Sequence, residues 1–566
     1  MPDAPSPARR HAEPAVRRRR IEIALVGAAG LLLAAVTKWP VLRHLRSSVP
    51  EDLGDPLLQT WQLAWGAHAL LRQPLHVFDA NAFHPLGGSL AFSDSLLGYA
   101  PLGLLFGSGP QAAVLRYNTI FLLTYALAFA GAYALARQLG CRPAAAALSG
   151  VGFAYAPWHL AQEGHLQILS SGGIPLALAL LARGHGYPRG PARPRLVLLG
   201  WAVAAWQVTL GFGLGLAFGY LLGALAVVFV VRRLAARRTL PRPLVLTDLA
   251  GGLGFLVVAI AFAVPYLQVA QVHPESRRSL GEVGVYSPPL SGLITSPADS
   301  AVLGPRQEGL RAGLGWPPEM TLSPGLVLIA LAVVGLVLAP WSLRRRLGLG
   351  LASALLVAFA QGTRLYDGRF TYLLLYDHAP GWQGIRTPGR LVVLLTLALA
   401  LLAGGALHRV LSSRAPLALR GSLAGLALLL VLGEGWGTTP TPAVPVLPAA
   451  LDRPQARVLV LPSNAAFDNT AMYWSTAGLY PLVNGNSGFV PSELAVLRDQ
   501  VRSFPDASSV VLLEQFGVDQ VILLPSYAVG TPWEGAQDRP FAGLGLERRA
   551  VGDAVVYDVL GSRATS

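Results

Sequence analysis

Long apolar stretches recur along the chain from residue 21 to residue 438, and short breaks rich in arginine, glycine or proline separate them. Most of the stretches are close to the ~20 residues that a helix needs to cross the hydrocarbon core of a bilayer. The pattern therefore predicts an α-helical polytopic membrane protein with about eleven transmembrane helices. The predicted helices cover residues 21–42, 114–136, 143–158, 166–182, 196–210, 214–231, 245–267, 322–340, 347–361, 389–407 and 421–438.

Residues 439–566 have a different pattern. A linker rich in proline and threonine is followed by a β-like stretch at 457–462, a helix-like stretch at 491–504 and a helix-to-strand unit at 508–525. Two further β-like stretches follow at 546–560. Short strands mixed with helical stretches predict a small soluble α/β domain, docked on the membrane-embedded part.

The arginines fix a predicted topology, because loops rich in Lys and Arg stay on the cytoplasmic side. All the basic breaks can share that side if the number of crossings is odd. This predicts a basic cytoplasmic tail (1–20), a transmembrane module (21–438) with a first external loop at 43–113, and an extracytoplasmic C-terminal domain (439–566). The basic breaks are residues 1–20, 137–142, 183–195, 232–242, 344–346 and 408–420.

Nearly every unusual polar cluster lies outside the cytoplasm on this topology. Residues 95–107 lie on the same side and are apolar, but they are too few to span a bilayer comfortably, so we expect a short re-entrant or interfacial segment. If that segment crosses, the number of crossings changes. The predicted external segments are residues 43–113, 159–165, 268–321, 362–388 and 439–566.

Composition agrees with a membrane protein and excludes several kinds of chemistry. The chain is 53% hydrophobic and only 13% charged. Its net charge of +14 comes from arginines between apolar stretches, which indicates topology and not nucleic-acid binding. Lys38 is the only lysine and no glycine precedes it, so the phosphate-binding Gly-Lys-Ser/Thr loop is absent. With Cys141 alone, neither an intrachain disulfide nor a multi-thiolate zinc site can form.

Three carboxylates, Glu51, Asp52 and Asp55, follow the first predicted helix. One explanation is a solvated helix cap, since Asp before Pro56 is an ordinary start signal. The other is catalysis: a carboxylate at the membrane boundary can act as a general base, and Asp55 could also bind a divalent metal such as Mg²⁺ or Mn²⁺. The spacing of Trp61 and Trp65 suggests that the helix after Asp55 lies flat in the interface.

Further polar groups follow in the external segments. His84 precedes Pro85 and is expected to be a loop residue, with metal binding as the alternative. Asp94 is either a second acid or the cap of the re-entrant segment. His159 suits structural hydrogen bonding as well as function, whereas Glu163 and His165 are expected to bind substrate because ionisable groups at helix mouths are costly to keep.

Arginines on the external side break the positive-inside pattern and need a separate reason. Arg277 and Arg278 stand beside Glu282 and Tyr286, and Arg386 and Arg390 stand at the mouth of a predicted helix. Guanidinium groups bind phosphate well, so the four arginines are candidate donor-phosphate ligands, with Glu282 and Tyr286 as substrate contacts. The alternative is pairing with nearby acids: Glu282, Glu319, Asp367 or Asp377. The aromatic and amide-rich stretch 472–489 suits sugar binding or ordinary loop packing.

The order of "EDLGDP", "FHP…LAFSD", "HLAQEGHLQ", "RTPGRL" and "LVNGNSGF" resembles bacterial polytopic proteins of the C-type glycosyltransferase superfamily. The resemblance implies a bacterial inner-membrane enzyme that takes a sugar from a polyprenyl-phosphate donor and transfers it with inversion. The acceptor would be a glycan, a lipid or a protein on the extracytoplasmic face. The hallmark acid of the superfamily lies in the first external loop, where Asp55, Asp52 and Glu51 stand.

Two other functions remain open from the sequence. A secondary transporter or lipid flippase would carry inverted repeats and ionisable groups at mid-membrane, and neither is evident. A non-catalytic component of glycan assembly or export would use the external domain for binding. In the catalytic interpretation Asp55 takes a proton from the acceptor hydroxyl, while Arg386, Arg390, Arg277 or Arg278 stabilises the departing lipid phosphate.

Overall fold

A computed structural model describes residues 7–188, 190–237 and 241–561 of the chain. Each of the eleven predicted membrane segments contains a helix. The corresponding helices are α1 (Pro7–Thr37), α5 (Pro110–Gln138), α6 (Pro143–Ala154), α7 (Leu166–Leu169) with α8 (Gly173–Gly184), α9 (Pro194–Val208), α10 (Phe212–Ala235), α11 (Arg242–Val272), α15 (Leu326–Leu338), α16 (Leu343–Ala360), α18 (Val392–Leu411) and α19 (Leu417–Glu434). The α-helical polytopic fold is therefore confirmed.

Seven helical segments within the described residues are long and apolar enough to cross a bilayer. They include α10 and α11, whose apolar side chains such as Val228, Leu253 and Val257 are exposed, as expected for surfaces that face lipid. The total of eleven crossings stays a prediction. Residues 95–107 contain only the short turns Leu97–Tyr99 and α4 (Ala100–Gly103), which are far too short to span.

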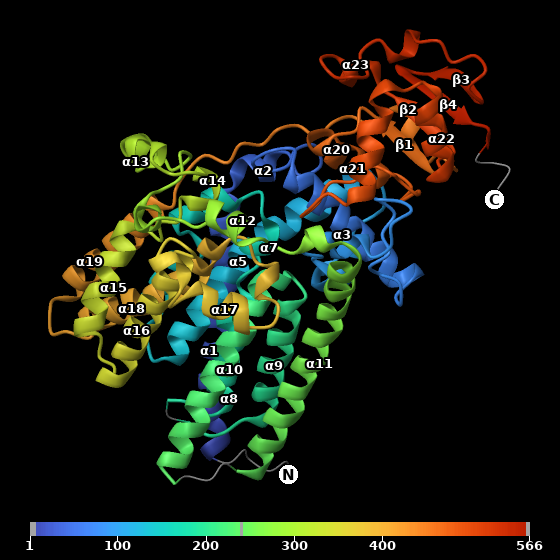
Figure 1. The fold of residues 1–566 in the computed structure, drawn as a ribbon. Helices are drawn as coiled ribbons and strands as arrows, with labels where there is room; N and C mark the ends of the chain where they lie inside the picture. The colour runs from blue at the N-terminus through green and yellow to red at the C-terminus, as the bar shows by residue number, and fades with distance from the viewer. Residues whose placement is uncertain (1–6, 189, 238–240, 562–566) are drawn as a thin grey trace, which may run out of the picture.

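The long helices form one bundle with shared packing (Figure 1). Helix α5 packs against α1, α6 and α8, while α18 packs against α6, α15 and α16. The lower end of α1 and the C-terminal domain lie at opposite ends of the bundle (Figure 1). The short helices α2 (Trp39–Arg43), α12 (Leu280–Val285), α13 (Glu308–Ala312), α14 (Pro317–Met320) and α17 (Tyr372–His378) lie in the connections.

Four of the basic breaks contact one another, as the topology prediction requires. Arg345 donates from Nε to the Tyr187 hydroxyl (3.1 Å) and from Nη1 to the Leu139 carbonyl (3.2 Å). Arg142 donates from Nη1 to the Leu411 carbonyl (2.7 Å) and from its backbone N–H to His408 (3.1 Å). These contacts place breaks 137–142, 183–195, 344–346 and 408–420 at one end of the bundle.

The C-terminal region carries a mixed four-stranded sheet in the order β1-β2-β4-β3. Parallel β1 and β2 pair with Val458 opposite Gln520, and β4 pairs antiparallel with both β2 and β3. The α/β prediction is confirmed, although the pattern did not predict helix α20. The elements are β1 (Val458–Leu461), α20 (Ala465–Ser475), α21 (Ser492–Gln500), α22 (Ala507–Gln515), β2 (Gln520–Leu523), α23 (Pro525–Ala528), β3 (Leu546–Val551) and β4 (Ala554–Val559).

Part of the amide-rich stretch 472–489 serves packing. Asn484 is buried and bonds both backbone groups of Val460, accepting at 2.7 Å and donating at 2.8 Å. Trp474 of α20 is also fully buried. These two residues therefore support the loop-packing alternative over sugar binding.

Helix α3 (Asp55–Arg72) lies between the bundle and the C-terminal domain, in contact with α5 and α20. The interfacial placement of Trp61 and Trp65 was wrong, because both side chains are buried. Trp61 donates to Asn81 Oδ1 (2.9 Å) and Trp65 donates to the Val77 carbonyl (2.8 Å). The C-terminal domain covers the face that the sequence pattern assigned to lipid.

Candidate active site

Asp55 stands at the first residue of α3, where the chain turns into the helix. Gly54 precedes it, and Pro56 occupies the first turn, where a missing N–H costs no hydrogen bond. The unpaired N–H groups of a helix start also favour a nearby negative charge. This junction fixes Asp55 while leaving its side chain 45% exposed, so that a substrate can reach the carboxylate.

His165 faces Asp55 from the start of α7, with Nε2 3.2 Å from Asp55 Oδ2. Gln59 of α3 holds the two helix starts together. Its Oε1 accepts from the Leu166 N–H (3.0 Å), and its Nε2 donates to Gln167 Oε1 (2.7 Å). Among the described residues, the buried Nδ1 of His165 has no hydrogen-bond partner.

The row of charges continues through Glu319 to Arg390. His165 Nε2 lies 3.7 Å from Glu319 Oε1, and Arg390 grips the same carboxylate with two bonds, Nη2 to Oε1 at 2.6 Å and Nε to Oε2 at 3.3 Å. For Arg390, the pairing alternative is therefore realised. Asp55, His165, Glu319 and Arg390 form a row in which the charge signs alternate.

The charged neighbours set the ionisation of Asp55 and His165. Burial acts to raise the pKa of Asp55, but the hydrogen bond and charge of His165, with the charges of Arg390 and Arg386, bring the net pKa below its ordinary value. Burial acts to lower the pKa of His165, but Asp55 and Glu319 bring it above its ordinary value. Asp55 is thus ionised at neutral pH and His165 is biased toward the cation.

Arg386 lies next to this row in a second group with Glu282 and Tyr286. Its Nη1 is 3.5 Å from Glu282 Oε1, and its guanidinium carbon is 5.2 Å from the centroid of the Tyr286 ring. Arg278 is more firmly held, since it donates to Glu282 Oε1 (3.1 Å) and to the Gly488 carbonyl (2.8 Å). Arg386 keeps 38% of its side chain exposed and is therefore more open to a ligand than Arg278 (13%) or Arg390 (22%).

Two of the predicted site residues, Asp52 and Arg277, belong neither to the row from Asp55 to Arg390 nor to the group around Arg386. Asp52 is exposed, and its Oδ1 accepts the Gly54 N–H (2.8 Å), which is a local turn. Arg277 is exposed beside the firmly held Arg278. Both remain predictions as site residues, without support from the geometry.

Glu163 is buried below the site in an ion pair with Lys38, the two side chains being 1% and 4% exposed. The Tyr125 hydroxyl also donates to Glu163 (3.1 Å), and Lys38 donates to Thr439 Oγ1 (3.3 Å). A direct substrate contact is incompatible with this burial. Glu163 instead ties the end of α1 to the loop that carries His165.

The other external polar residues have structural partners. Asp94 caps a helix, but that helix is α10: its Oδ1 accepts from the N–H groups of Phe212 (2.6 Å) and Gly213 (3.3 Å). Burial raises the pKa of Asp94 despite these bonds. His159 is buried against Trp158, with ring centroids 3.7 Å apart, and burial lowers its pKa to about 3. Both are therefore explained without catalysis.

Glu51 lies beside the site, and its Oε2 accepts a hydrogen bond from the Gly164 N–H. Burial is the main cause that raises the pKa of Glu51 to about 7; the Gly164 bond and the His165 charge oppose it, and the charges of Glu163 and Asp52 add to it. The two carboxylates of one loop thus differ in pKa: that of Asp55 lies below its ordinary value, and that of Glu51 lies above it.

We expect the Glu51→Gln variant to flatten the pH dependence of stability. A carboxyl whose pKa is raised on folding stabilises the fold fully below its unfolded pKa, and that contribution is lost as pH rises toward the folded pKa of about 7. The amide stays neutral and its oxygen can still accept the Gly164 bond. The unfolding temperature measured from pH 5 to pH 8 should therefore fall less in Glu51→Gln than in the wild type or in Asp52→Asn. Equal slopes in all three proteins would contradict this assignment.

The sequence did not predict that Lys38 forms a buried ion pair beneath the site, and it indicated Glu319 only as a possible partner of an arginine. Lys38 carried a signal, because an ionisable group at the end of an apolar helix is costly and usually has a partner. Glu319, in α14, carried none, since its neighbours Pro317 and Met320 suggest no site.

A metal at Asp55 stays a prediction, and the residues around it do not fit one well. Among the described residues, the group of three ligand-type side chains with ligand atoms within 4.8 Å of one another is His273, Glu275 and Glu493, which does not include Asp55. The Asp55 carboxylate is paired with His165, whose raised pKa favours the protonated form that cannot bind a metal.

The sequence matches no protein-family model and no curated protein. The structure is similar to that of arabinofuranosyltransferase AftD from Mycobacteria, with a TM-score of 0.53 and 17% identity over 95% of this chain and 40% of that chain. A mutant of the same enzyme gives a TM-score of 0.57 and 15% identity over 95% and 41%. The archaeal oligosaccharyltransferase AglB from Archaeoglobus fulgidus gives 0.46 and 14% over 89% and 69%.

The chain therefore shares its fold with a solved arabinofuranosyltransferase. This agrees with the fold that the resemblance implies. This chain spans about two fifths of the AftD chain.

Proposed function

We propose that the protein is a membrane glycosyltransferase that moves a sugar from a polyprenyl-phosphate donor to an acceptor hydroxyl, with inversion, on the extracytoplasmic face of the bacterial inner membrane. The observation that carries the proposal is the exposed, ionised Asp55 carboxylate, flanked by His165 and faced by arginines, in a C-type glycosyltransferase fold. A flippase or a binding component has no specific use for this arrangement.

In the proposed reaction Asp55 accepts the proton of the acceptor hydroxyl as its oxygen attacks the anomeric carbon. The bond between that carbon and the phosphate oxygen of the donor breaks on the opposite side, so the anomeric configuration inverts. His165 holds the Asp55 carboxylate in place through the 3.2 Å contact. Because attack and departure occur on opposite faces of the sugar, the base and the phosphate ligand belong on opposite sides of the bound sugar.

Arg386 is the preferred ligand of the departing phosphate. Its guanidinium is partly exposed and has one long ion pair, whereas Arg390 is bound by Glu319 through two bonds. Phosphate and guanidinium form short, charge-assisted bonds that strengthen as charge moves onto the leaving group. Arg390 then has the role of positioning Glu319 and, through it, His165.

Replacing Arg386 by Lys should separate these two roles. Lys keeps the charge but loses the planar fork, so we expect the donor KM to rise about 10-fold or more while the unfolding temperature stays unchanged. Arg390→Lys, the matched variant, should instead lower the unfolding temperature because it breaks the two-bond contact with Glu319. The assignment is wrong if donor KM is unaffected in Arg386→Lys, or if the two variants behave alike.

A panel assay tests the function itself. The purified full chain in lipid is incubated with polyprenyl-phosphate sugars and candidate glycan, lipid or protein acceptors, without added nucleotide. We expect transfer with at least one donor and no stimulation by ATP. The proposed orientation places the basic tail in the cytoplasm and the C-terminal domain outside. It is supported by four basic breaks, 137–142, 183–195, 344–346 and 408–420, which lie at one end of the bundle.

A further inference from the structure

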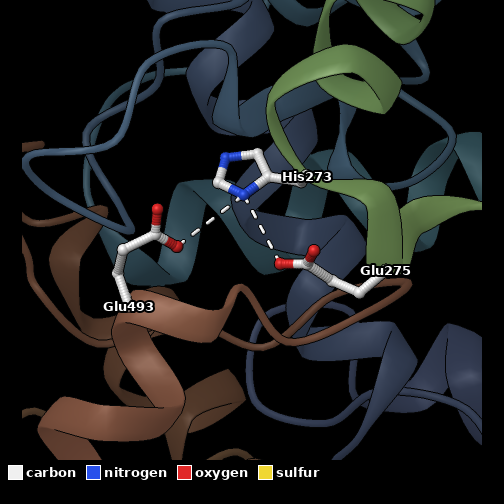
Figure 2. Close-up of side chains that lie close together, drawn as sticks. All are labelled: His273, Glu275 and Glu493. Carbon is white, nitrogen blue, oxygen red and sulfur yellow. Dashed lines mark ion pairs between the residues drawn. The ribbon is translucent and has the colours of Figure 1, made fainter.

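A second group of polar side chains joins the membrane bundle to the C-terminal domain. Helix α11 has 31 residues and is therefore about 45 Å long, more than the ~30 Å hydrocarbon core, so that it extends beyond the bilayer. His273 follows its last residue, Glu275 comes next in a short 3₁₀ turn (Pro274–Ser276), and Glu493 lies in the first turn of α21. Figure 2 shows both carboxylates directed at the same nitrogen of the His273 ring.

The distances suit ligands that share an ion better than direct hydrogen bonds. His273 Nδ1 lies 3.5 Å from Glu275 Oε1 and 3.7 Å from Glu493 Oε2, and the three ligand atoms lie within 4.8 Å of one another. A charge-assisted N–H···O bond is about 2.7–2.9 Å long. Tetrahedral zinc with bonds of about 2.0–2.1 Å places neighbouring ligand atoms about 3.4 Å apart.

The histidine nitrogen is buried and has no hydrogen bond. Only 4% of the His273 side chain is exposed, and Nδ1 has no hydrogen-bond partner within the described part of the chain. The ring is held by aromatic contacts with Phe92 (centroids 5.4 Å apart) and Phe489 (5.9 Å). A buried polar nitrogen that is fixed in this way and left without a hydrogen bond is costly unless a ligand completes it.

Ser492 orients both carboxylates. Its backbone N–H donates to Glu275 Oε1 (3.0 Å), and its hydroxyl donates to Glu493 Oε2 (3.2 Å). Such outer contacts fix ligand orientation in metal sites. The carboxylates remain 33% and 44% exposed, which leaves room for water as a further ligand.

We propose that His273, Glu275 and Glu493 form a zinc site that fastens the C-terminal domain to the end of α11. One imidazole nitrogen and two carboxylate oxygens suit Zn²⁺, whereas Mg²⁺ and Ca²⁺ prefer oxygen ligands alone. Two carboxylates and a neutral histidine balance the charge of one divalent ion. The nearby hydrogen bond from Arg278 to the Gly488 carbonyl also joins the two parts of the chain. Zinc would therefore help to hold the C-terminal domain over α3 and the candidate site.

Zinc binding is tested on the purified full chain, prepared without a histidine tag, stripped with a chelator and titrated with Zn²⁺. We expect one zinc per chain and a rise in the unfolding temperature. His273→Ala and Glu493→Gln should each weaken zinc affinity at least about 10-fold and lose the rise in unfolding temperature. Asp499→Asn, a solvent-facing change on the same helix α21, is the matched control and should behave as the wild type.

Unfolding temperatures in chelator show whether each variant is folded, and Glu493→Gln keeps the size of the side chain. The proposal is overturned if the wild type shows no stoichiometric zinc binding, or if folded His273→Ala and Glu493→Gln bind zinc as tightly as Asp499→Asn does. Because the readouts are binding and unfolding, the result is independent of any transferase activity.

Discussion

Asp55→Asn should reduce the rate of sugar transfer by about 10²–10⁴ and leave the unfolding temperature nearly unchanged. The amide has the shape of the carboxylate and can still accept a bond from His165 Nε2, but it cannot take a proton at neutral pH. The side chain is 45% exposed at a helix start where Asn is also a good residue, so the fold loses little. Transfer rate and unfolding temperature are measured on the same preparations.

Asp52→Asn is the matched control, because Asp52 lies three residues away and serves only its own turn. It should keep wild-type turnover, and Glu51→Gln should keep most of it. Normal turnover in a folded Asp55→Asn protein would remove Asp55 from catalysis, and loss in one of the two neighbours would move the role of base to that residue.

Lys38→Met should destabilise the protein by about 3–5 kcal/mol, because it leaves the Glu163 carboxylate buried without its counter-charge. The pair also connects the end of α1 to the loop of His165, so transfer should weaken through a displaced His165. Unfolding in detergent, followed by temperature or denaturant, measures the effect. The exposed pair Arg502–Asp499 provides the control, and Arg502→Met should cost at most about 1 kcal/mol.

The double variant Lys38→Met/Glu163→Gln separates a buried charge from lost packing. Removing both charges leaves no uncompensated ion, so stability should recover a large part of what Lys38→Met lost. If the double variant is as unstable as the sum of the single variants, or if Lys38→Met is as stable as Arg502→Met, the two groups do not form the pair described.

The sequence predicted the helices well, since apolar length and arginine breaks are local signals that the bilayer enforces. The predicted topology also places residues 43–113, 159–165, 268–321 and 362–388 on one side, where their polar residues can meet. His165 beside Asp55 is the best example: neither residue is near the other in sequence, yet both were singled out as external and ionisable.

The partners of individual charges could not be predicted, because pairing depends on three-dimensional packing. Arg390 forms an ion pair with Glu319 and is therefore not free to bind phosphate. Glu163 forms a buried ion pair with Lys38. The prediction that Trp61 lies in the membrane interface was wrong for the same reason. Its side chain is buried, and helix α3, which carries it, packs against α20. Helix α20 (Ala465–Ser475) was not predicted, and it overlaps only the first residues of the aromatic and amide-rich stretch 472–489, which suited sugar binding or loop packing.

The anomeric configuration of the product tests the central claim most directly. A polyprenyl-phosphate sugar identified in the panel assay is converted by the wild-type protein, and the product is followed by nuclear magnetic resonance together with release of polyprenyl phosphate. The account predicts a glycoside of inverted configuration, one polyprenyl phosphate released per sugar transferred, and neither product with Asp55→Asn. Retention of configuration, a sugar covalently attached to Asp55, or equal product from Asp55→Asn would contradict it.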